Sequence, residues 1–100
     1  MKILKDKVEC DLTIDTDTKI SGLVSGNVQV IEGTELFVSG LISGNLTISQ
    51  NAYVKVNGMV SGDVNNNGEI DVYGMVTGNI TNFDGIVTIH KDAMVNGKKY

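Results

Sequence analysis

Apolar residues alternate with small or polar residues along most of the chain. The longest stretches hold Ile20, Val24, Val28 and Val30; Leu36, Val38, Ile42, Leu46 and Ile48; Val54, Val56, Val60 and Val64; and Ile70, Val72, Val76 and Ile80. Successive side chains of a strand point to opposite sides, so this period of two predicts strands with one buried face. Helical spacing has no comparable run, which argues against a helical repeat.

Four segments repeat one motif: ISGLVSGNV (20–28), VSGLISGNL (38–46), VNGMVSGDV (56–64) and VYGMVTGNI (72–80). The copies begin 18, 18 and 16 residues apart. A unit that returns in register predicts one coil per copy, with like residues about 4.8 Å apart in neighbouring coils. The predicted fold is all-β, a single-stranded parallel β-helix with coils of 16–18 residues, about five to six of them. The recurring glycines fit its corners.

The length of 100 residues fits one domain. We expect a short N-terminal tail at 1–7 and a β-helix domain at 8–100. The segment TIHKDAMVNG (88–97) is interpreted as a shortened copy of TISQNAYVKVNG (47–58). Residues 1–10 lack the apolar run that is typical of a signal peptide or a membrane span, so the expected location is cytoplasmic.

Little in the composition points to chemistry. The net charge is −4 without a basic stripe, which argues against nucleic acid as a partner. Cys10 and His90 are the single cysteine and the single histidine, so neither a disulfide framework nor a three-histidine zinc site can form within one chain. The acidic run at Asp11, Asp15 and Asp17 lacks calcium-loop spacing. We therefore expect no enzyme activity, no catalytic residues, no metal and no cofactor.

The motif V-x-G-x-V-x-G-x-I, followed by the ending AMVNGKKY, resembles the bactofilin family of bacterial cytoskeletal proteins over about residues 8–100. The resemblance implies a right-handed β-helix of triangular cross-section that joins end to end into non-polar filaments without nucleotide. It also implies a membrane-binding N-terminal tail, so membrane association through the N-terminus stays open. The Pro-rich flanks of the family have no counterpart, since the chain contains no proline.

Two sets of side chains are expected to form ladders along the rod. Asn27, Asn45, Asp63 and Asn79 recur once per coil and can hydrogen-bond along the axis. A lateral stripe is predicted from Leu23, Leu41, Met59, Met75, Phe37 and Tyr73, if strand parity holds through the motif. Because the glycine corners could reverse that parity, the Leu/Met ladder could also point inward. An outward apolar stripe would mark an interaction surface.

The favoured function is a structural protein that self-assembles end to end into filaments or oligomers. Neither end of the sequence shows a capping helix, and uncapped solenoid ends expose unpaired backbone groups. The expected assembly interface is Val8, Cys10, Leu12 and Ile14 at one end, and Met94 and Val95 at the other. The alternative is a small cytosolic immunity protein that neutralises a protein partner through the Leu/Met stripe. The partner is thus either a second copy or another protein.

Overall fold

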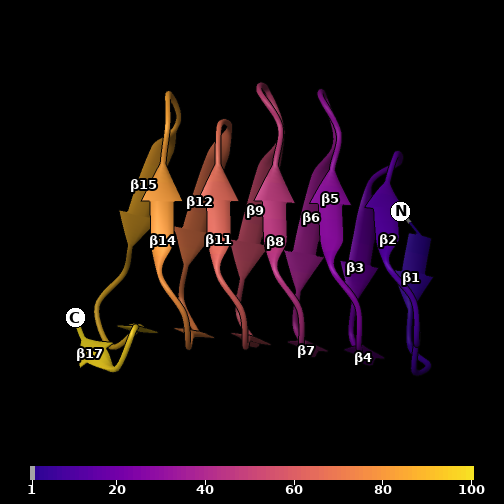
Figure 1. The fold of residues 1–100 in the computed structure, drawn as a ribbon, viewed down its shortest axis with the longest axis horizontal. Helices are drawn as coiled ribbons and strands as arrows, with labels where there is room; N and C mark the ends of the chain where they lie inside the picture. Colours follow the sequence, from indigo (N-terminus) through magenta and orange to yellow (C-terminus); the bar gives the residue numbers. More distant parts are fainter. Residues whose placement is uncertain (1) are drawn as a thin grey trace.

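The computed structural model describes residues 2–100, and within them the chain is all-β and helix-free (Figure 1). Its strands stack in parallel into three sheets, which we call walls A, B and C, and together they form a β-solenoid of about five coils.

Wall A consists of β1 (Lys2–Leu4), β3 (Thr18–Ile20), β6 (Glu35–Val38), β9 (Tyr53–Val56), β12 (Glu69–Val72) and β15 (Ile86–Ile89). Wall B consists of β4 (Leu23–Val24), β7 (Leu41–Ile42), β10 (Met59–Val60), β13 (Met75–Val76), β16 (Met94–Val95) and β17 (Lys98–Lys99). Wall C consists of β2 (Leu12–Ile14), β5 (Val28–Val30), β8 (Leu46–Ile48), β11 (Val64–Asn66) and β14 (Ile80–Asn82).

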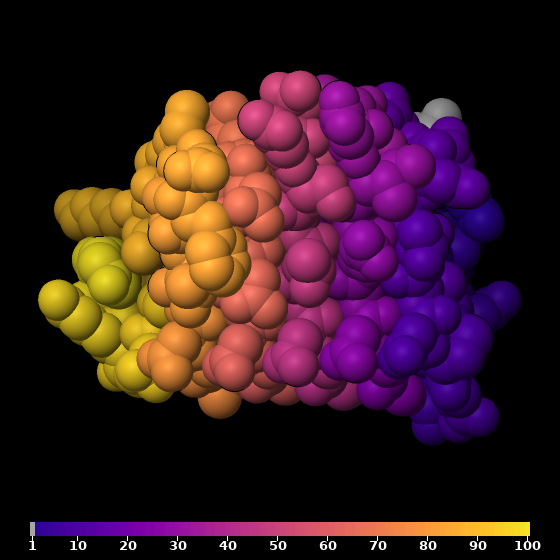
Figure 2. Space-filling model, turned by 45° about the horizontal axis from the view of Figure 1, so that its top comes forward, coloured from indigo at the N-terminus to yellow at the C-terminus, as the bar shows by residue number. Residues whose placement is uncertain are grey.

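One coil visits the three walls in the order A, B, C, and each wall strand pairs with its counterpart in the next coil. Leu23 pairs with Leu41, and Leu41 with Met59, which are the steps of 18 residues seen in the repeat. The expected parallel stacking of like residues is therefore confirmed. We number the coils by their wall A strands, so β1 opens coil 1 and β15 opens a partial coil 6. Figure 2 shows the coils as successive bands along the rod, whose longest extent is 30 Å.

The core is a column of aliphatic layers, because each wall turns its alternate apolar residues inward. Val24, Ile42 and Val60 from wall B are completely buried. Each fully buried Val or Ile side chain contributes roughly 1.5–3 kcal/mol to folding relative to an exposed one.

Glycine at the corners follows from the distance between coils. A Cβ on Gly44 would lie 2.5 Å from the carbonyl oxygen of Gly26 in the preceding coil, closer than atoms can pack. A Cβ on Gly58 would likewise overlap the carbonyl oxygen of Gly40. The glycines therefore recur because backbone meets backbone at these corners.

The shortened step between coils 4 and 5 depends on one buried polar residue. Asn66 occupies the inward position that Ile48 holds one coil earlier, and it is fully buried. Its side-chain amide donates to the carbonyl of Gly68 at 3.2 Å, and its side-chain oxygen accepts from the N–H of Gly68 at 3.2 Å. The amide thus satisfies a tight turn that is two residues shorter than the corresponding turn at 49–52.

The boundary expected for the N-terminal tail was wrong. Strand β1 lies within residues 1–7 and pairs in parallel with β3, Ile3 opposite Lys19. Coil 1 therefore includes these residues. Coil 1 was not recognised from the sequence, because β1 contains a lysine and is not followed by a corner glycine of the repeat.

The prediction that residues 88–97 are a shortened copy of residues 47–58 was also wrong, because the two segments lie on different walls. Ile89 pairs with Val72 on wall A, whereas Ile48, its expected counterpart, lies on wall C. Asn96 and Gly97 have φ values of 51° and 79° and form a two-residue turn, after which β17 runs back antiparallel to β16. Asn-Gly is the preferred sequence of such a hairpin turn.

Candidate assembly surfaces

The N-terminal end of the rod presents an incomplete apolar layer. Leu4, Val8 and Leu12 come from the three walls, pack against the core and remain partly exposed. Ile14 belongs to the same coil as these residues and is 4% exposed. Strands β1 and β2 are the edge strands of walls A and C here, so their outer backbone groups face solvent. The four residues predicted for this end, Val8, Cys10, Leu12 and Ile14, all lie in this terminal coil, and Leu4 was missed.

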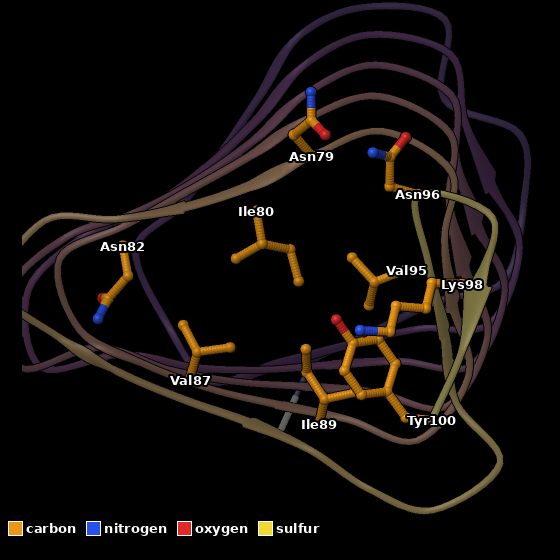
Figure 3. Close-up of a pocket in the computed structure, with 9 residues that line it drawn as sticks. All are labelled: Asn79, Ile80, Asn82, Val87, Ile89, Val95, Asn96, Lys98 and Tyr100. Carbon is orange, nitrogen blue, oxygen red and sulfur yellow. The ribbon is translucent and has the colours of Figure 1, made fainter.

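The C-terminal end holds a cavity of about 360 Å³ that opens along the rod axis. Figure 3 shows Ile80, Val87, Ile89 and Val95 pointing into this opening from the three walls, with Tyr100 beside it. The first three are partly exposed, whereas Val95 is 7% exposed. Val95 was predicted from the sequence. Ile80, Val87 and Ile89 were missed, because residues 88–97 were assigned to the wrong walls.

Met94, the other residue predicted for this end, points outward on wall B. Its strand edge is covered, because Met94 pairs with Lys99 of β17. The hairpin is held further by the N–H of Tyr100, which donates to the carbonyl of Ala93 at 2.9 Å. The expectation of an uncapped C-terminal end was therefore wrong for wall B, while β14 and β15 remain edge strands of walls C and A.

The predicted Asn/Asp ladder runs along the corner between walls B and C. The backbone N–H of Asn45 donates to the side-chain oxygen of Asn27 at 2.8 Å, and the N–H of Asp63 donates to Asn45 at 2.8 Å. The same bond joins Asn79 to Asp63 at 2.9 Å and Asn27 to Asp11 at 2.8 Å. The ladder therefore has a direction, since each side chain accepts from the following coil.

Cys10 stands where every later coil has glycine on this corner. A Cβ on Gly26 would lie 2.6 Å from the carbonyl oxygen of Cys10, which identifies Cys10 as its counterpart in coil 1. In the later coils a Cβ here would strike the backbone of the preceding coil. Cys10 tolerates its side chain, which is exposed, because coil 1 has no predecessor within residues 2–100.

The Leu/Met ladder points outward, which settles the question that the sequence left open. Leu23, Leu41, Met59, Met75 and Met94 follow one another at single-coil steps on wall B. Each is partly exposed, while its inward neighbour is buried. Phe37 and Tyr73 also face outward, but they belong to the wall A side, so the predicted stripe consists of two separate surfaces.

Wall A carries a group of contacting polar and aromatic side chains that the sequence did not reveal. The Tyr53 hydroxyl donates to Asp71 Oδ2 at 2.5 Å, and His90 Nε2 lies 3.7 Å from Asp71 Oδ1. The ring of Tyr73 stacks on that of His90 with centroids 3.8 Å apart. Burial and the hydrogen bond to Asp71 raise the pKa of the Tyr53 hydroxyl above its usual 10.0.

The side chains of Tyr53, Asp71, Tyr73 and His90 form one contact network. Tyr53 keeps its proton in the hydrogen bond to Asp71, whose second oxygen, Oδ1, faces His90 Nε2. Among residues 2–100, no three His, Cys, Asp or Glu side chains are placed to hold a metal ion. The contacts join coils 4, 5 and 6 across the outer face of wall A.

No protein-family model matches the chain, and neither a curated protein nor a solved structure matches it. Within the described part of the chain, no helix is long and apolar enough to cross a membrane.

Proposed function

We propose that the protein is a non-enzymatic structural protein that self-assembles end to end, as a bactofilin-like scaffold. The observation that carries this proposal is the pair of open apolar layers at the two ends. Val24 on wall B and Val72 on wall A are fully buried, whereas their counterparts at the two ends, Val8 and Ile89, are only partly buried. Contact between ends buries these layers and pairs the edge strands.

The ends differ in which contacts they allow. If the C-terminal end of one copy stacked on the N-terminal end of another in the register of the coils, Cys10 would strike the partner's backbone at the position reserved for glycine. Strand β17 would also occupy the place of the incoming wall B strand. Two independent obstacles thus oppose head-to-tail stacking. The rods can then join only through two N-terminal ends or two C-terminal ends.

Arginine at each end tests the proposal. Leu12→Arg blocks the N-terminal layer and Val87→Arg blocks the C-terminal layer, because a charge buried in the contact has no partner. Both side chains are partly exposed, so the free monomer can direct the guanidinium to solvent. Thr13→Arg and Thr88→Arg are matched controls, since these exposed residues follow Leu12 and Val87 on the same strands and point outward.

Sedimentation velocity and negative-stain electron microscopy give the readout. We expect extended assemblies from the wild-type protein and both controls, and no more than two rods joined end to end in either single variant. The double variant should show no end-to-end assembly. Loss of all end contact in a single variant would instead indicate head-to-tail stacking. A wild-type protein that shows no end contact at high concentration would contradict the proposal.

A further inference from the structure

The outer face of wall B carries two parallel rows of side chains that differ in size. The partly exposed Leu/Met ladder forms a ridge along the rod. Beside it runs a row of small side chains, two positions further along each coil, which we call the furrow: Ser25, Ser43, Ser61 and Thr77. Their backbone N–H groups donate to Val8, Val24, Ile42 and Val60 of the preceding coil at 2.7–2.8 Å, which keeps the furrow parallel to the ridge.

We infer that wall B is a lateral interface that binds wall B of a second copy, with the two rods parallel. A two-fold axis along the rods places the ridge of each copy in the furrow of the other, and such isologous contacts are self-complementary. Ridge and furrow share one repeat distance in both copies, so the match extends along the whole wall. An antiparallel arrangement about the perpendicular axis places ridge against ridge.

Charge supports the same occupant. In coil 1 the ridge position is Lys7 and the furrow position is Glu9, as the pairing of Val8 with Val24 shows. Within one chain Lys7 Nζ lies 3.0 Å from Glu9 Oε1, and both side chains are largely exposed. The parallel two-fold arrangement places each lysine opposite the second copy's glutamate. The ridge from Leu23 to Met94 and the furrow beside it carry no charge, so the net charge of −4 lies elsewhere.

This lateral contact is independent of end-to-end association, and the end-blocked variant Leu12→Arg/Val87→Arg isolates it. Sedimentation equilibrium of that variant is expected to show a dimer. Adding Met59→Asp, which places a carboxylate on the ridge, should raise its dissociation constant by about 30-fold or more. Ser43→Lys fills the furrow without touching the core and should have the same effect. Thr47→Asp, an outward substitution on wall C, is the matched control and should change nothing.

Cross-linking tests the direction of the rods. In a Cys10→Ser background with blocked ends, Leu23→Cys mixed with Ser25→Cys should give disulfide-linked dimers, since ridge and furrow of the same coil meet. Leu23→Cys mixed with Met75→Cys should not, because these positions approach each other only in antiparallel rods.

Three results would overturn the inference: a monomeric end-blocked variant, a dimer that Met59→Asp and Ser43→Lys leave intact, or preferential linkage of positions 23 and 75. Failure of end-to-end association alone would leave the lateral dimer in place, so the two proposals can fail separately. A different protein bound to the ridge in preference to a second copy would also count against it.

Discussion

Walls A and B are built by the same coils but present different surfaces. In coils 3 to 6 the strands of wall A have four residues, and their outward side chains contact those of neighbouring coils, as Tyr53 and Asp71 do. The strands of wall B have two residues between glycine corners and expose a ridge such as Leu41 and Met59. Side chains thus bind coils together on wall A, whereas wall B depends on backbone packing and leaves apolar side chains uncovered.

The largest effect is expected where wall B depends on a corner. Gly58→Ala should lower the free energy of unfolding by about 3 kcal/mol, because its Cβ overlaps the carbonyl oxygen of Gly40 and backbone must move. Asn57→Ala, at the neighbouring exposed residue, should cost far less. Urea unfolding of both variants measures the difference. Equal stabilities would mean that the corners tolerate side chains, and the contrast between the walls would disappear.

A smaller effect is expected on wall A. Asp71→Ala removes the acceptor of the Tyr53 hydroxyl and the carboxylate beside His90, and should cost about 1–2 kcal/mol. The double variant with Tyr53→Phe should cost little more than Asp71→Ala, since both changes remove one interaction. Thermal or urea unfolding of the cycle checks this. Additive losses would show that the two side chains act separately.

Alkaline pH should weaken wall A selectively. The folded protein holds the Tyr53 proton more tightly than the unfolded chain, because its pKa is raised from the usual 10.0. Stability from this group is therefore retained below pH 10 and lost as the pH rises above it. Urea midpoints should fall more steeply above this pH in the wild type than in Tyr53→Phe. Identical slopes for the two proteins would contradict the assignment.

The smallest effect is expected on the ridge of wall B. Met59→Ala should change the free energy of unfolding of the monomer by about 0.5 kcal/mol or less, since the side chain is outward and partly exposed. The end-blocked variant is the proper background, because its monomer can be studied alone by dilution. A loss as large as that of Asp71→Ala would mean that the ridge stabilises the coil itself.

The fold could be predicted because it repeats. Alternating apolar residues and glycines at steps of 16 to 18 residues specify strands, corners and stacking at once. The Tyr53, Asp71 and His90 group escaped prediction because its members occupy different positions in three different coils and meet along a diagonal. Asn96–Gly97 is a typical hairpin-turn sequence, but the prediction treated these residues as part of another copy of the repeat.

The amino-acid sequence by itself determined the parallel β-solenoid, because the same local pattern recurs in each coil and only stacking buries it. Tertiary structure decided what happens where the repetition stops. The outward direction of the Leu/Met ridge depends on how the chain turns at the glycine corners of each coil. The place of Cys10 on a glycine corner and the return of β17 over wall B depend on which coil lies next to which. A residue at an end has a neighbour on one side only, and no repeat pattern contains that information.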